Sequence, residues 1–266
     1  MLTGKNALVT GSTRGLGQAI ARALAAEGCN VMLNGFGDAG DIERDRAALS
    51  AEAGVTVRYH GADLSKDEEV DALADAALAE LGSVDILVNN AVIRYFHPAE
   101  EFPRAEWRHA LAVNLSAPFF LMQRVLPGMR RAGWGRIVNI ASVLGLGARS
   151  GRVDYVTSKT GLIGLTRAIA AETAAERNIT CNAICPGSVL TPNSEMKLAE
   201  FVAESGLPPD EAEAEYLRIR GQKVGFILPE RVAKFAVFLC QDSSFDITGA
   251  ALPIDQGKSA TWLDRD

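Results

Sequence analysis

Three side chains near the middle of the chain have the types and spacing of a proton-transfer site. Ser142 ends the apolar run GRIVNIAS, and Tyr155 and Lys159 follow 13 and 17 residues later. A spacing of four places Tyr155 and Lys159 on one face of a helix, with the ammonium near the phenol. A cation at this position favours the phenolate, so Tyr155 could act as a general acid or base near neutral pH. Ser142 would then hold the substrate oxygen.

A glycine-rich loop near the N-terminus has the pattern of a phosphate-binding turn. Gly11, Gly15 and Gly17 lie in TGSTRGLG, between the first apolar run and the first helical pattern. Such turns let backbone N–H groups approach a phosphate at the positive end of a helix dipole. Glycines also form ordinary tight turns, but the position at the first strand-to-helix connection favours a dinucleotide site. Arg14, within the loop, could bind a 2′-phosphate.

The end of the second expected strand leaves both NAD and NADP open. An acidic residue usually binds the adenosine ribose there, and a basic residue accommodates the extra phosphate of NADP. Asn34, Gly35 and Phe36 stand at this place instead, and Asp38 would matter only if the loop bends back. The absence of a second basic residue beside Asn34 favours NAD.

Polar residues end the third and fourth expected strands. Asp63 could accept a hydrogen bond from adenine; alternatively, Asp63 or Ser65 caps a helix that begins at Lys66. Asn89 and Asn90 follow the apolar run VDILV. Ligands bind at the carboxyl edge of a doubly wound sheet, so we expect Asn90 to face the adenosine side of a cofactor and Asn89 to support the sheet.

Short apolar runs alternate with helical patterns along the chain, which is typical of repeated βαβ units. The sequence therefore predicts an α/β fold, a doubly wound, Rossmann-like parallel sheet of about seven strands with helices on both faces. The expected strands lie at 6–11, 30–36, 55–63, 84–90, 135–142, 179–187 and 249–255. The expected helices lie at 15–28, 66–82, 103–133, 154–177 and 229–240.

A single domain over residues 1–266 is the simplest organisation, because no linker, internal repeat or low-complexity tract divides the chain. An insertion around 193–228 departs from the βαβ rhythm and mixes helical with loop character. Its charge content is typical of a solvated pair of surface helices. Its position between the last two strands also suits a substrate lid.

Composition narrows the range of partners. The 266 residues are 48% hydrophobic and carry a net charge of -6, with no basic cluster in the sequence, which argues against nucleic acid and anionic membranes. No secretory leader pattern and no apolar run of about 18 residues is present, so we expect a cytoplasmic protein. The cysteines (Cys29, Cys181, Cys185 and Cys240) lack metal-ligand spacing, and we expect reduced core thiols and no metal site.

Together these motifs resemble the classical short-chain dehydrogenase/reductase family along essentially the whole chain. The matching motifs are TGSTRGLG, ADL at 62–64, NNA at 89–91, Asn114 within AVNLSAPF, the Ser142, Tyr155 and Lys159 set, and CPGSVLTP at 185–192. The resemblance implies an NAD(P)-dependent enzyme that interconverts a secondary alcohol and a ketone on a small-molecule substrate, assembled as a homotetramer. It also implies that Asn114 kinks its helix and holds a water that relays protons from Lys159.

The resemblance extends the expected cofactor site. With those derived above, the implied positions are Gly11, Thr13, Arg14, Gly15, Leu16, Gly17, Phe36, Asp63, Leu64, Asn90, Tyr155, Lys159, Pro186, Gly187, Val189 and Thr191. Lys159 would bind the nicotinamide ribose, and Thr191 would contact the nicotinamide amide or the pyrophosphate. Val92 and Gln256 stand where the family normally has glycine. We expect Val92 to keep a negative φ and to narrow the site near the ribose.

Within that family the chain is most similar to bacterial D-3-hydroxybutyrate dehydrogenases. The positions that bind the short carboxylate substrate there correspond to Arg94, Leu144, Arg152, Ser188 and a place near Lys197, and the family's residues are replaced at all of them. Arginine binds carboxylates in a bidentate manner, so the replacements predict a more cationic pocket for a larger or differently shaped hydroxy or oxo acid. The alternative is that these arginines form surface salt bridges.

Two other functions stay open. An NADPH-dependent 3-oxoacyl reductase is supported by Arg14 in the glycine loop. A catalytically idle NAD(P)-sensing binding protein on the same fold is disfavoured by the complete set of Ser142, Tyr155, Lys159 and Asn114.

Overall fold

The computed structural model describes residues 2–176, 178–222 and 224–261. The two ends of the predicted domain (residue 1 and residues 262–266), Arg177 in the predicted helix 154–177 and Lys223 in the predicted insertion lie outside these described residues.

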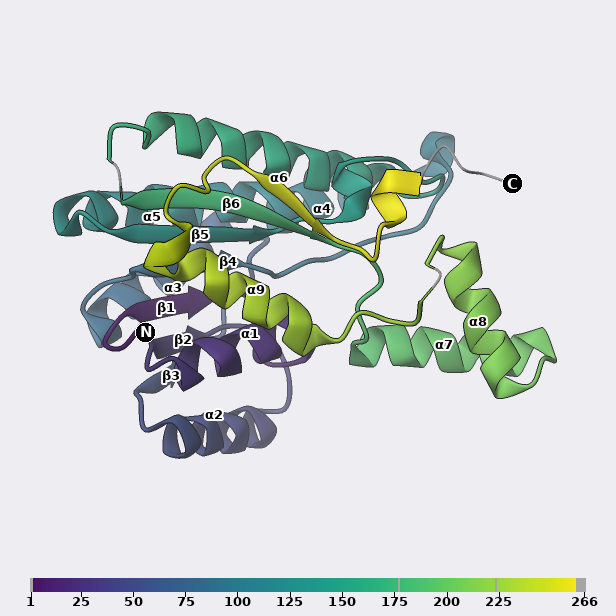
Figure 1. The fold of residues 1–266 in the computed structure, drawn as a ribbon, viewed down its shortest axis with the longest axis horizontal. Coiled ribbons are helices and arrows are strands. Elements are labelled where there is room, and N and C mark those ends of the chain that lie inside the picture. The colour runs from purple at the N-terminus through teal and green to yellow at the C-terminus, as the bar shows by residue number, and fades with distance from the viewer. Residues whose placement is uncertain (1, 177, 223, 262–266) are drawn as a thin grey trace.

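Parallel strands form one seven-stranded sheet in the order β3-β2-β1-β4-β5-β6-β7 (Figure 1). The strands are β1 (Asn6–Val9), β2 (Asn30–Leu33), β3 (Val57–Tyr59), β4 (Ile86–Asn89), β5 (Gly135–Ile140), β6 (Ile179–Pro186) and β7 (Ala251–Ile254). The strand order reverses where β1 lies between β2 and β4. This reversal is the switch point at which open α/β sheets bind ligands, and the prediction of a doubly wound sheet is confirmed.

Helices cover both faces of the sheet (Figure 1). They are α1 (Gly15–Ala26), α2 (Ala39–Ala53), α3 (Asp67–Leu81), α4 (Arg104–Leu111), α5 (Ala117–Ala132), α6 (Val153–Glu172), α7 (Pro192–Ser205), α8 (Pro209–Ile219) and α9 (Pro229–Cys240). Alternate residues of β1 serve the two faces: Ala7 and Val9 are buried with α1 and α9, and Leu8 is buried with α3 and α5. A strand buried on both faces explains why the run reads as continuously apolar.

Two helical regions differ from the prediction. The helix α2 was missed because Ile42 and Leu49 are its buried residues and the rest is largely charged or exposed, which gives weak apolar periodicity. The predicted helix 103–133 is divided by a π turn, Ala112–Ser116, between α4 and α5. The predicted helix 229–240 matches α9 at both ends, and the other predicted helices are present with shifted ends, as is usual for helix boundaries.

The insertion forms the helix pair α7 and α8, which stands beyond the carboxyl ends of the strands (Figure 1). Thr191 and Ser194 form a reciprocal capping box at the start of α7, in which the Thr191 N–H donates to Ser194 Oγ at 2.6 Å. The rings of Phe201 and Tyr216 join the two helices edge to face, with centroids 5.5 Å apart. The two helices of the insertion therefore pack against each other, and none of the residues of α7 is buried.

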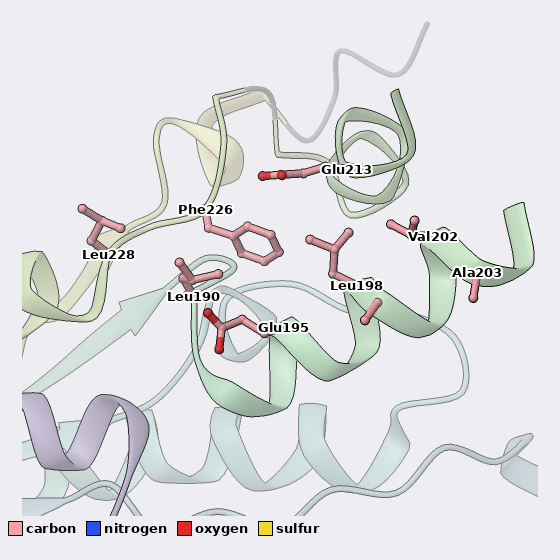
Figure 2. A pocket seen from close by; sticks show the side chains of 9 residues that line it. Leu190, Glu195, Leu198, Val202, Ala203, Glu213, Phe226 and Leu228 are labelled. Carbon is pink, nitrogen blue, oxygen red and sulfur yellow. The ribbon is translucent and has the colours of Figure 1, made fainter. Parts of the chain in front are cut away.

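A hollow of about 660 Å³ lies between the two helices and the strand-like segment that follows them (Figure 2). Leu190, Leu198, Val202 and Phe226 project into it, and the carboxylates of Glu195 and Glu213 also line it. Its lining is mainly aliphatic and aromatic.

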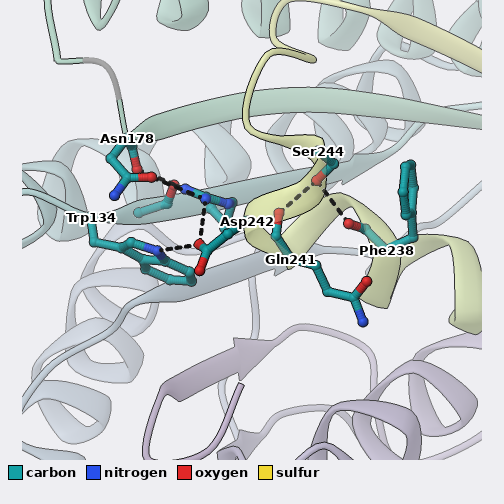
Figure 3. Close-up of polar contacts among 8 residues, drawn as sticks. Trp134, Asn178, Phe238, Gln241, Asp242 and Ser244 are labelled. Atoms are coloured by element: carbon teal, nitrogen blue, oxygen red, sulfur yellow. Dashed lines mark hydrogen bonds and ion pairs between the residues drawn. The ribbon is translucent and has the colours of Figure 1, made fainter. Parts of the chain in front are cut away.

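A buried guanidinium ties β5 to the C-terminal part of the chain (Figure 3). The Arg136 side chain is fully buried, donates to the Asn178 carbonyl at 2.7 Å and lies 3.4 Å from Asp242 Oδ1. Trp134 Nε1 donates to the same carboxylate at 3.3 Å, and Lys5 lies 4.0 Å from the centre of the Trp134 ring. Hydrogen bonds and a counter-charge therefore offset part of the cost of burying this cation, although its Nε has no hydrogen-bond partner among the described residues.

The cysteines are all buried and unpaired, which confirms the prediction of core thiols. Burial raises the pKa of the Cys29 and Cys240 thiols to about 12, so both are protonated and inert at neutral pH. Among the described residues, none of the helices could cross a membrane. The same residues hold no group of His, Cys, Asp and Glu side chains arranged to bind a metal ion.

Candidate active site

The glycine loop and the end of β4 are bonded together at the switch point of the sheet. Asn90 Nδ2 donates to the carbonyl oxygens of Thr10 at 2.9 Å and Gly11 at 3.0 Å. A Cβ at Gly17 would lie 2.2 Å from the Gly11 oxygen and 2.4 Å from Asn90 Nδ2. Glycine is therefore required at 17 for the first turn of α1 to approach the loop. The Asn90 carboxamide braces this loop, and a direct contact with a cofactor stays a prediction.

Asn89 supports the sheet, as expected from the sequence. Its Nδ2 donates to Asn139 Oδ1 at 2.8 Å, and Asn139 Nδ2 donates to Thr166 Oγ1 at 2.9 Å. This buried chain of polar groups links β4, β5 and α6. It fixes the position of the helix that carries Tyr155 and Lys159 relative to the sheet.

Two helix N-termini converge beside the glycine loop. The first turn of α1 begins at Gly15, and α7 begins directly after its capping residue Thr191. A Cβ at Gly15 would lie 3.6 Å from the Thr191 Cβ and 3.7 Å from Pro192 Cδ. Both helix dipoles therefore present their positive ends at one place, which is suited to a diphosphate.

The loop after β2 is fixed by uncharged groups. Asn34 is buried, and its Nδ2 donates to the His60 carbonyl at 3.2 Å. Thr13 Oγ1 donates to the Phe36 carbonyl at 2.9 Å, while the Phe36 side chain is 67% exposed. Asp38 is the N-cap of α2, and its Oδ1 accepts hydrogen bonds from two backbone N–H groups of that helix. Its carboxylate therefore has a structural role here.

Asp63 does not cap the helix that follows it, so one of its two expected roles is wrong. Helix α3 begins at Asp67 behind Lys66, with no side-chain cap, so neither Asp63 nor Ser65 caps it. Instead, Asp63 Oδ1 accepts hydrogen bonds from the backbone N–H of Ser65 at 3.0 Å and from its hydroxyl at 2.7 Å. These bonds lower the pKa of the Asp63 carboxyl. The Asp63 carboxylate is hydrogen-bonded within the turn that precedes α3, so it does not accept from the first N–H groups of that helix.

Three other predicted cofactor positions lie in the packed interior. Leu64 is buried in the core cluster that includes α3 and α5, while Leu16 and Val189 are partly buried against the cluster on the other face. Pro186 ends β6, and Gly187 follows it with its backbone N–H bonded to the Ile254 carbonyl at 2.9 Å. A contact of these residues with a cofactor stays a prediction.

Lys159 is a buried cation on the face of α6 that carries Tyr155. Its Nζ donates to the Ile140 carbonyl at 2.6 Å and lies 5.8 Å from the centre of the Tyr155 ring. Burial, and then the positive charge of Arg94, lowers the pKa of Lys159 from 10.5 to about 7. The ammonium therefore titrates near neutral pH in this environment.

Ser142 lies on a turn that is pressed against the same helix. Its Oγ accepts a hydrogen bond from the Leu144 N–H at 3.1 Å, which starts the 3-10 turn Val143–Gly145. A Cβ at Gly145 would lie 2.9 Å from the carbonyl oxygen of Lys159. The missing side chain lets the turn sit directly on α6, so Ser142, Tyr155 and Lys159 come from neighbouring segments. Leu144 contributes its backbone to this turn.

Asn114 lies in the π turn and ties three segments together. Its Oδ1 accepts from the Ile93 N–H at 2.9 Å, and its Nδ2 donates to the Ile93 carbonyl at 2.8 Å and to Ser158 Oγ at 3.2 Å. The π turn is the departure from regular helix that was expected at this residue. Asn114 thereby positions the segment after β4 against the residue that precedes Lys159.

A buried glutamine, missed in the sequence, holds the segment after β6. Gln222 is 2% exposed; its Oε1 accepts from the Ser188 N–H at 2.7 Å, and its Nε2 donates to the Gly225 carbonyl at 2.8 Å. Ser188, a predicted substrate position, is thus bonded through its backbone to the end of the insertion. A single polar residue in an irregular segment gives no periodic signal that could have revealed this role.

The predicted substrate-side cations come together. Arg152 Nη1 donates to the Tyr95 carbonyl at 2.9 Å, and its guanidinium lies 5.1 Å from the centre of the Phe96 ring. Burial lowers the pKa of both Arg152 and Lys197, and the nearby charge of Arg94 lowers both further. Within the described part of the chain, no ion pair joins Arg94, Arg152 or Lys197 to a carboxylate. The alternative of surface salt bridges is therefore wrong.

The two residues that replace usual glycines behave differently. Among the described residues, Gln256 is the only non-glycine residue with a positive φ, at 57°. The chain thus keeps the left-handed turn there without a glycine. Val92 is not in the left-handed region, which confirms its expected negative φ, and its side chain is 41% exposed.

Comparisons with known proteins agree with this geometry. The family model for short chain dehydrogenase matches residues 5–200. A D-beta-hydroxybutyrate dehydrogenase from Cupriavidus necator is 41% identical over 257 residues, covering 97% of this chain and 98% of that protein. A second D-beta-hydroxybutyrate dehydrogenase, from Rhizobium meliloti, is 39% identical and covers 96% and 99%. The crystal structure of L-sorbose reductase from Gluconobacter frateurii, complexed with NADPH and L-sorbose, has a TM-score of 0.91 at 29% identity, with 97% of each chain covered.

Proposed function

Because this chain belongs to the short-chain dehydrogenase family and is an oxidoreductase, we propose that it interconverts a secondary alcohol and a ketone on a small hydroxy or oxo acid. The observation that carries the proposal is the buried Lys159 ammonium beside Tyr155, with Ser142 on a turn packed against the same helix. The similarity to two D-beta-hydroxybutyrate dehydrogenases supports an acid as the substrate.

Tyr155, Ser142 and Lys159 have distinct roles in this proposal. Tyr155 exchanges the proton with the substrate oxygen, and Ser142 donates a hydrogen bond to that oxygen. Lys159 stabilises the phenolate by its charge, and Asn114 fixes the helix beneath them. When bound, the nicotinamide supplies or accepts the hydride.

The glycine loop fits the diphosphate of such a cofactor. The space at Gly17 that a Cβ would fill and the two helix N-termini at Gly15 and Thr191 form a cradle for it. Lys159 would bind the nicotinamide ribose, and the loop after β2 would receive the adenosine. We expect NAD to be preferred, because residues 34–38 carry no cation for a 2′-phosphate.

An NADPH-dependent 3-oxoacyl reductase is a second candidate. Arg14 is exposed in the glycine loop, and within the described residues no ion pair involves it. Its guanidinium is therefore available to a 2′-phosphate. Equilibrium binding of NADH and NADPH separates the two candidates: tighter NADH binding supports the first, and tighter NADPH binding the second.

We also propose that α7 and α8 act as a substrate lid and that the chain works as a cytoplasmic homotetramer. The proposal of a lid is supported by the placement of the helix pair beyond the carboxyl ends of the strands (Figure 1).

The proposal of a cytoplasmic compartment is supported by the buried free thiols, which a reducing environment preserves. The assembly rests on exposed aromatic side chains such as Phe119 on α5 and Phe238 on α9, and light scattering of the purified chain tests it.

The deciding experiment is a screen of hydroxy acids and neutral secondary alcohols with NAD and NADP. We expect oxidation of at least one hydroxy acid, and its loss in Tyr155→Phe with cofactor binding retained. Cofactor binding without hydride transfer to or from any alcohol or ketone would instead support an idle cofactor-sensing protein.

A further inference from the structure

The segment after β4 resembles a strand without a neighbouring strand. Residues 91–98 belong to no helix or strand, yet exposure alternates along them. The exposed residues include Val92, Arg94 and Phe96, and the partly buried ones include Ile93, Tyr95 and His97. A period of two is typical of an extended chain, in which alternate side chains point to opposite sides. Arg94 and Phe96 therefore lie on one side of the segment.

Side chains take the place of a neighbouring strand by bonding the backbone of this segment. Asn114 accepts from the Ile93 N–H and donates to the Ile93 carbonyl. Two residues on, Asp154 Oδ2 accepts from the Tyr95 N–H at 3.0 Å, and Arg152 Nη1 donates to the Tyr95 carbonyl at 2.9 Å. Both backbone groups of alternate residues are thus satisfied by side chains from other elements. The residue that lies between them is therefore fixed at both of its ends.

Asp154 and Arg152 lie just before Tyr155, the candidate proton donor. Asp154 is in the first turn of α6, and Arg152 directly precedes that helix. The Phe96 ring packs beside them: its centre lies 5.1 Å from the Arg152 guanidinium, and a Cβ at Gly151 would lie 2.8 Å from its Cζ. The segment after β4 and the start of the helix that carries Tyr155 are therefore one packed unit.

Arg94 brings a positive charge from this segment to the proton-transfer residues. It lies on the same side of the segment as Phe96, whose ring packs beside Arg152. The pKa of Lys159 is lowered by burial and then by the charge of Arg94, and so is the pKa of Arg152. A substrate carboxylate bound by Arg94 would therefore lie close to the proton-transfer site. The position of the guanidinium then sets the position of the carbon that reacts.

Asp154 is a costly residue to bury at this place. Its side chain is fully buried, and among the described residues its Oδ1 has no hydrogen-bond partner and its carboxylate forms no ion pair. A buried carboxyl group that is only partly satisfied lowers stability. Residues that lower stability without an evident structural gain are expected at functional sites. The bond from the Tyr95 N–H is therefore the contact through which Asp154 acts.

We propose that Asp154 is a positioning residue for acid substrates. By holding the Tyr95 N–H, it fixes Arg94 where the guanidinium can bind the substrate carboxylate while the carbinol carbon lies beside Tyr155. This inference rests on the function proposed above and adds a specificity-determining residue to that site. Asp154 touches neither the substrate nor the cofactor, and it takes no part in the bond changes.

Paired substitutions of Asp154 test the proposal. Asp154→Asn keeps an acceptor oxygen for the Tyr95 N–H, whereas Asp154→Leu has a similar volume and no acceptor. The substrates are the hydroxy acid that is oxidised best in the screen and its methyl ester, which lacks the charge. We expect the wild type to prefer the acid by at least about 10-fold in kcat/KM. Asp154→Leu should lower this preference about 10-fold, mainly through KM for the acid, and Asp154→Asn by less than about threefold.

Two results of these substitutions would overturn the proposal. An unchanged preference in Asp154→Leu would show that the bond to the Tyr95 N–H does not affect the binding of acids. Equal losses in Asp154→Asn and Asp154→Leu would show that the charge of the carboxylate, and not its hydrogen bond, is what matters.

Asp85→Leu is the matched control, because it also removes a buried carboxylate from a backbone N–H. Asp85 Oδ2 accepts from the Asn6 N–H at 2.9 Å, at the amino ends of β1 and β4 and thus at the opposite edge of the sheet from the site. We expect Asp85→Leu to lower the midpoint of urea unfolding and to leave the preference for the acid unchanged. A loss of preference as large as that in Asp154→Leu would reduce the effect to general destabilisation and overturn the proposal.

Hydrogen exchange of the Tyr95 amide reports the proposed bond directly. The amide should exchange at least about tenfold faster in Asp154→Leu than in the wild type, and within about threefold of the wild-type rate in Asp154→Asn. A loss of preference for the acid in Asp154→Leu with unchanged exchange of this amide would contradict a role through Tyr95.

A double substitution shows whether Asp154 acts through Arg94. Arg94→Met should remove the preference for the acid, and adding Asp154→Leu should then change the preference by less than about twofold. Two effects that multiply in full would mean that Asp154 and Arg94 act independently, and the proposal would fail.

Calorimetry separates this proposal from the function on which it rests. The NADH-loaded wild-type chain should bind butyrate at least about 10-fold more tightly than Asp154→Leu does, with Asp154→Asn close to the wild type. This result supports the positioning role even if no alcohol is oxidised, in which case the proposed function alone fails. Equal butyrate binding by the wild type and Asp154→Leu overturns the positioning role, and retained oxidation of the acid would leave the proposed function standing.

Discussion

The side-chain nitrogen of Asn90 occupies the space that a Cβ on Gly17 would need, 2.4 Å from the position of that atom. The two residues are far apart in the sequence, yet neither can change alone. The amide bonds of Asn90 to Thr10 and Gly11 hold the glycine loop, and the absent side chain of Gly17 leaves room for that amide.

Gly17→Ala should therefore weaken both the fold and the cofactor site. Overpacking of this kind costs about 1–3 kcal/mol, and the loop must move to accept the methyl group. We expect a lower midpoint of urea unfolding and an increase of at least about tenfold in the Kd for NADH. Gly164→Ala is the matched control, because a Cβ there meets no atom within 4 Å and alanine favours the helix. Unchanged NADH affinity in Gly17→Ala would contradict the proposal that the glycine loop holds the cofactor diphosphate.

Lys159 should make the stability depend on pH. Its folded-state pKa of about 7 lies below the unfolded value, so the unfolded chain binds more protons between these two values. Stability from this group therefore rises with pH above about 7, by up to about 1.4 kcal/mol per unit. Urea unfolding at pH 7.5 and 8.5 should show that the free energy of unfolding of the wild type rises relative to that of Lys159→Met over this interval. Parallel profiles for the two proteins would show that the buried ammonium is not destabilised.

Asn114→Ala should distinguish a positioning role of Asn114, which would change kcat, from a purely structural role, which would change stability alone. The substitution leaves the Ile93 N–H and carbonyl without their side-chain partners, at a cost of about 1–3 kcal/mol. Because the segment after β4 then loosens beside Lys159, we expect kcat to fall more than NADH affinity. Gln123→Ala, which removes an exposed carboxamide from α5, is the control and should change neither quantity. A fall in stability with kcat unchanged would restrict Asn114 to a structural role.

Gln256→Gly should stabilise the chain. A non-glycine residue in the left-handed region costs about 1–2 kcal/mol, and glycine removes this cost. Glycine also gives the unfolded chain more conformational freedom, which offsets part of the stabilisation. We expect a net increase of roughly 0.5–1 kcal/mol in the free energy of unfolding. The same change at Gln241, which has φ -76° and ψ 156°, should destabilise by a similar amount. A loss of stability in Gln256→Gly would show that the glutamine side chain contributes contacts of its own.

Much of the fold and the centre of the site could be predicted because their signals are local. The strand runs, the glycine loop and the Tyr155 to Lys159 spacing each lie within a few residues. The helix α2 escaped because only a narrow stripe, Ile42 and Leu49, is buried. The cap that was one of two possible roles of Asp63 is wrong, because the sequence does not reveal whether a turn or the helix receives its carboxylate.

The substrate end could be predicted only in part. Arg94, Arg152 and Lys197 were found by their correspondence to family positions. Arg149 and Arg220 lie close enough to Lys258 to lower its pKa, and tertiary structure alone brings these distant segments together. Gln222 was missed for the same reason, since its partners Ser188 and Gly225 define its role.

The π turn at Ala112–Ser116 changes the phase of the helical segment on its two sides. One extra residue in a turn rotates everything after it by about 100° relative to a regular helix. With that rotation, Asn114 reaches Ile93 and Ser158 while Leu121, Met122 and Val125 of α5 still face the sheet. Deleting one residue within the turn would turn either the amide or the apolar side chains away. The added residue therefore lets one continuous segment meet two angular requirements that a uniform helix of this sequence could not satisfy together.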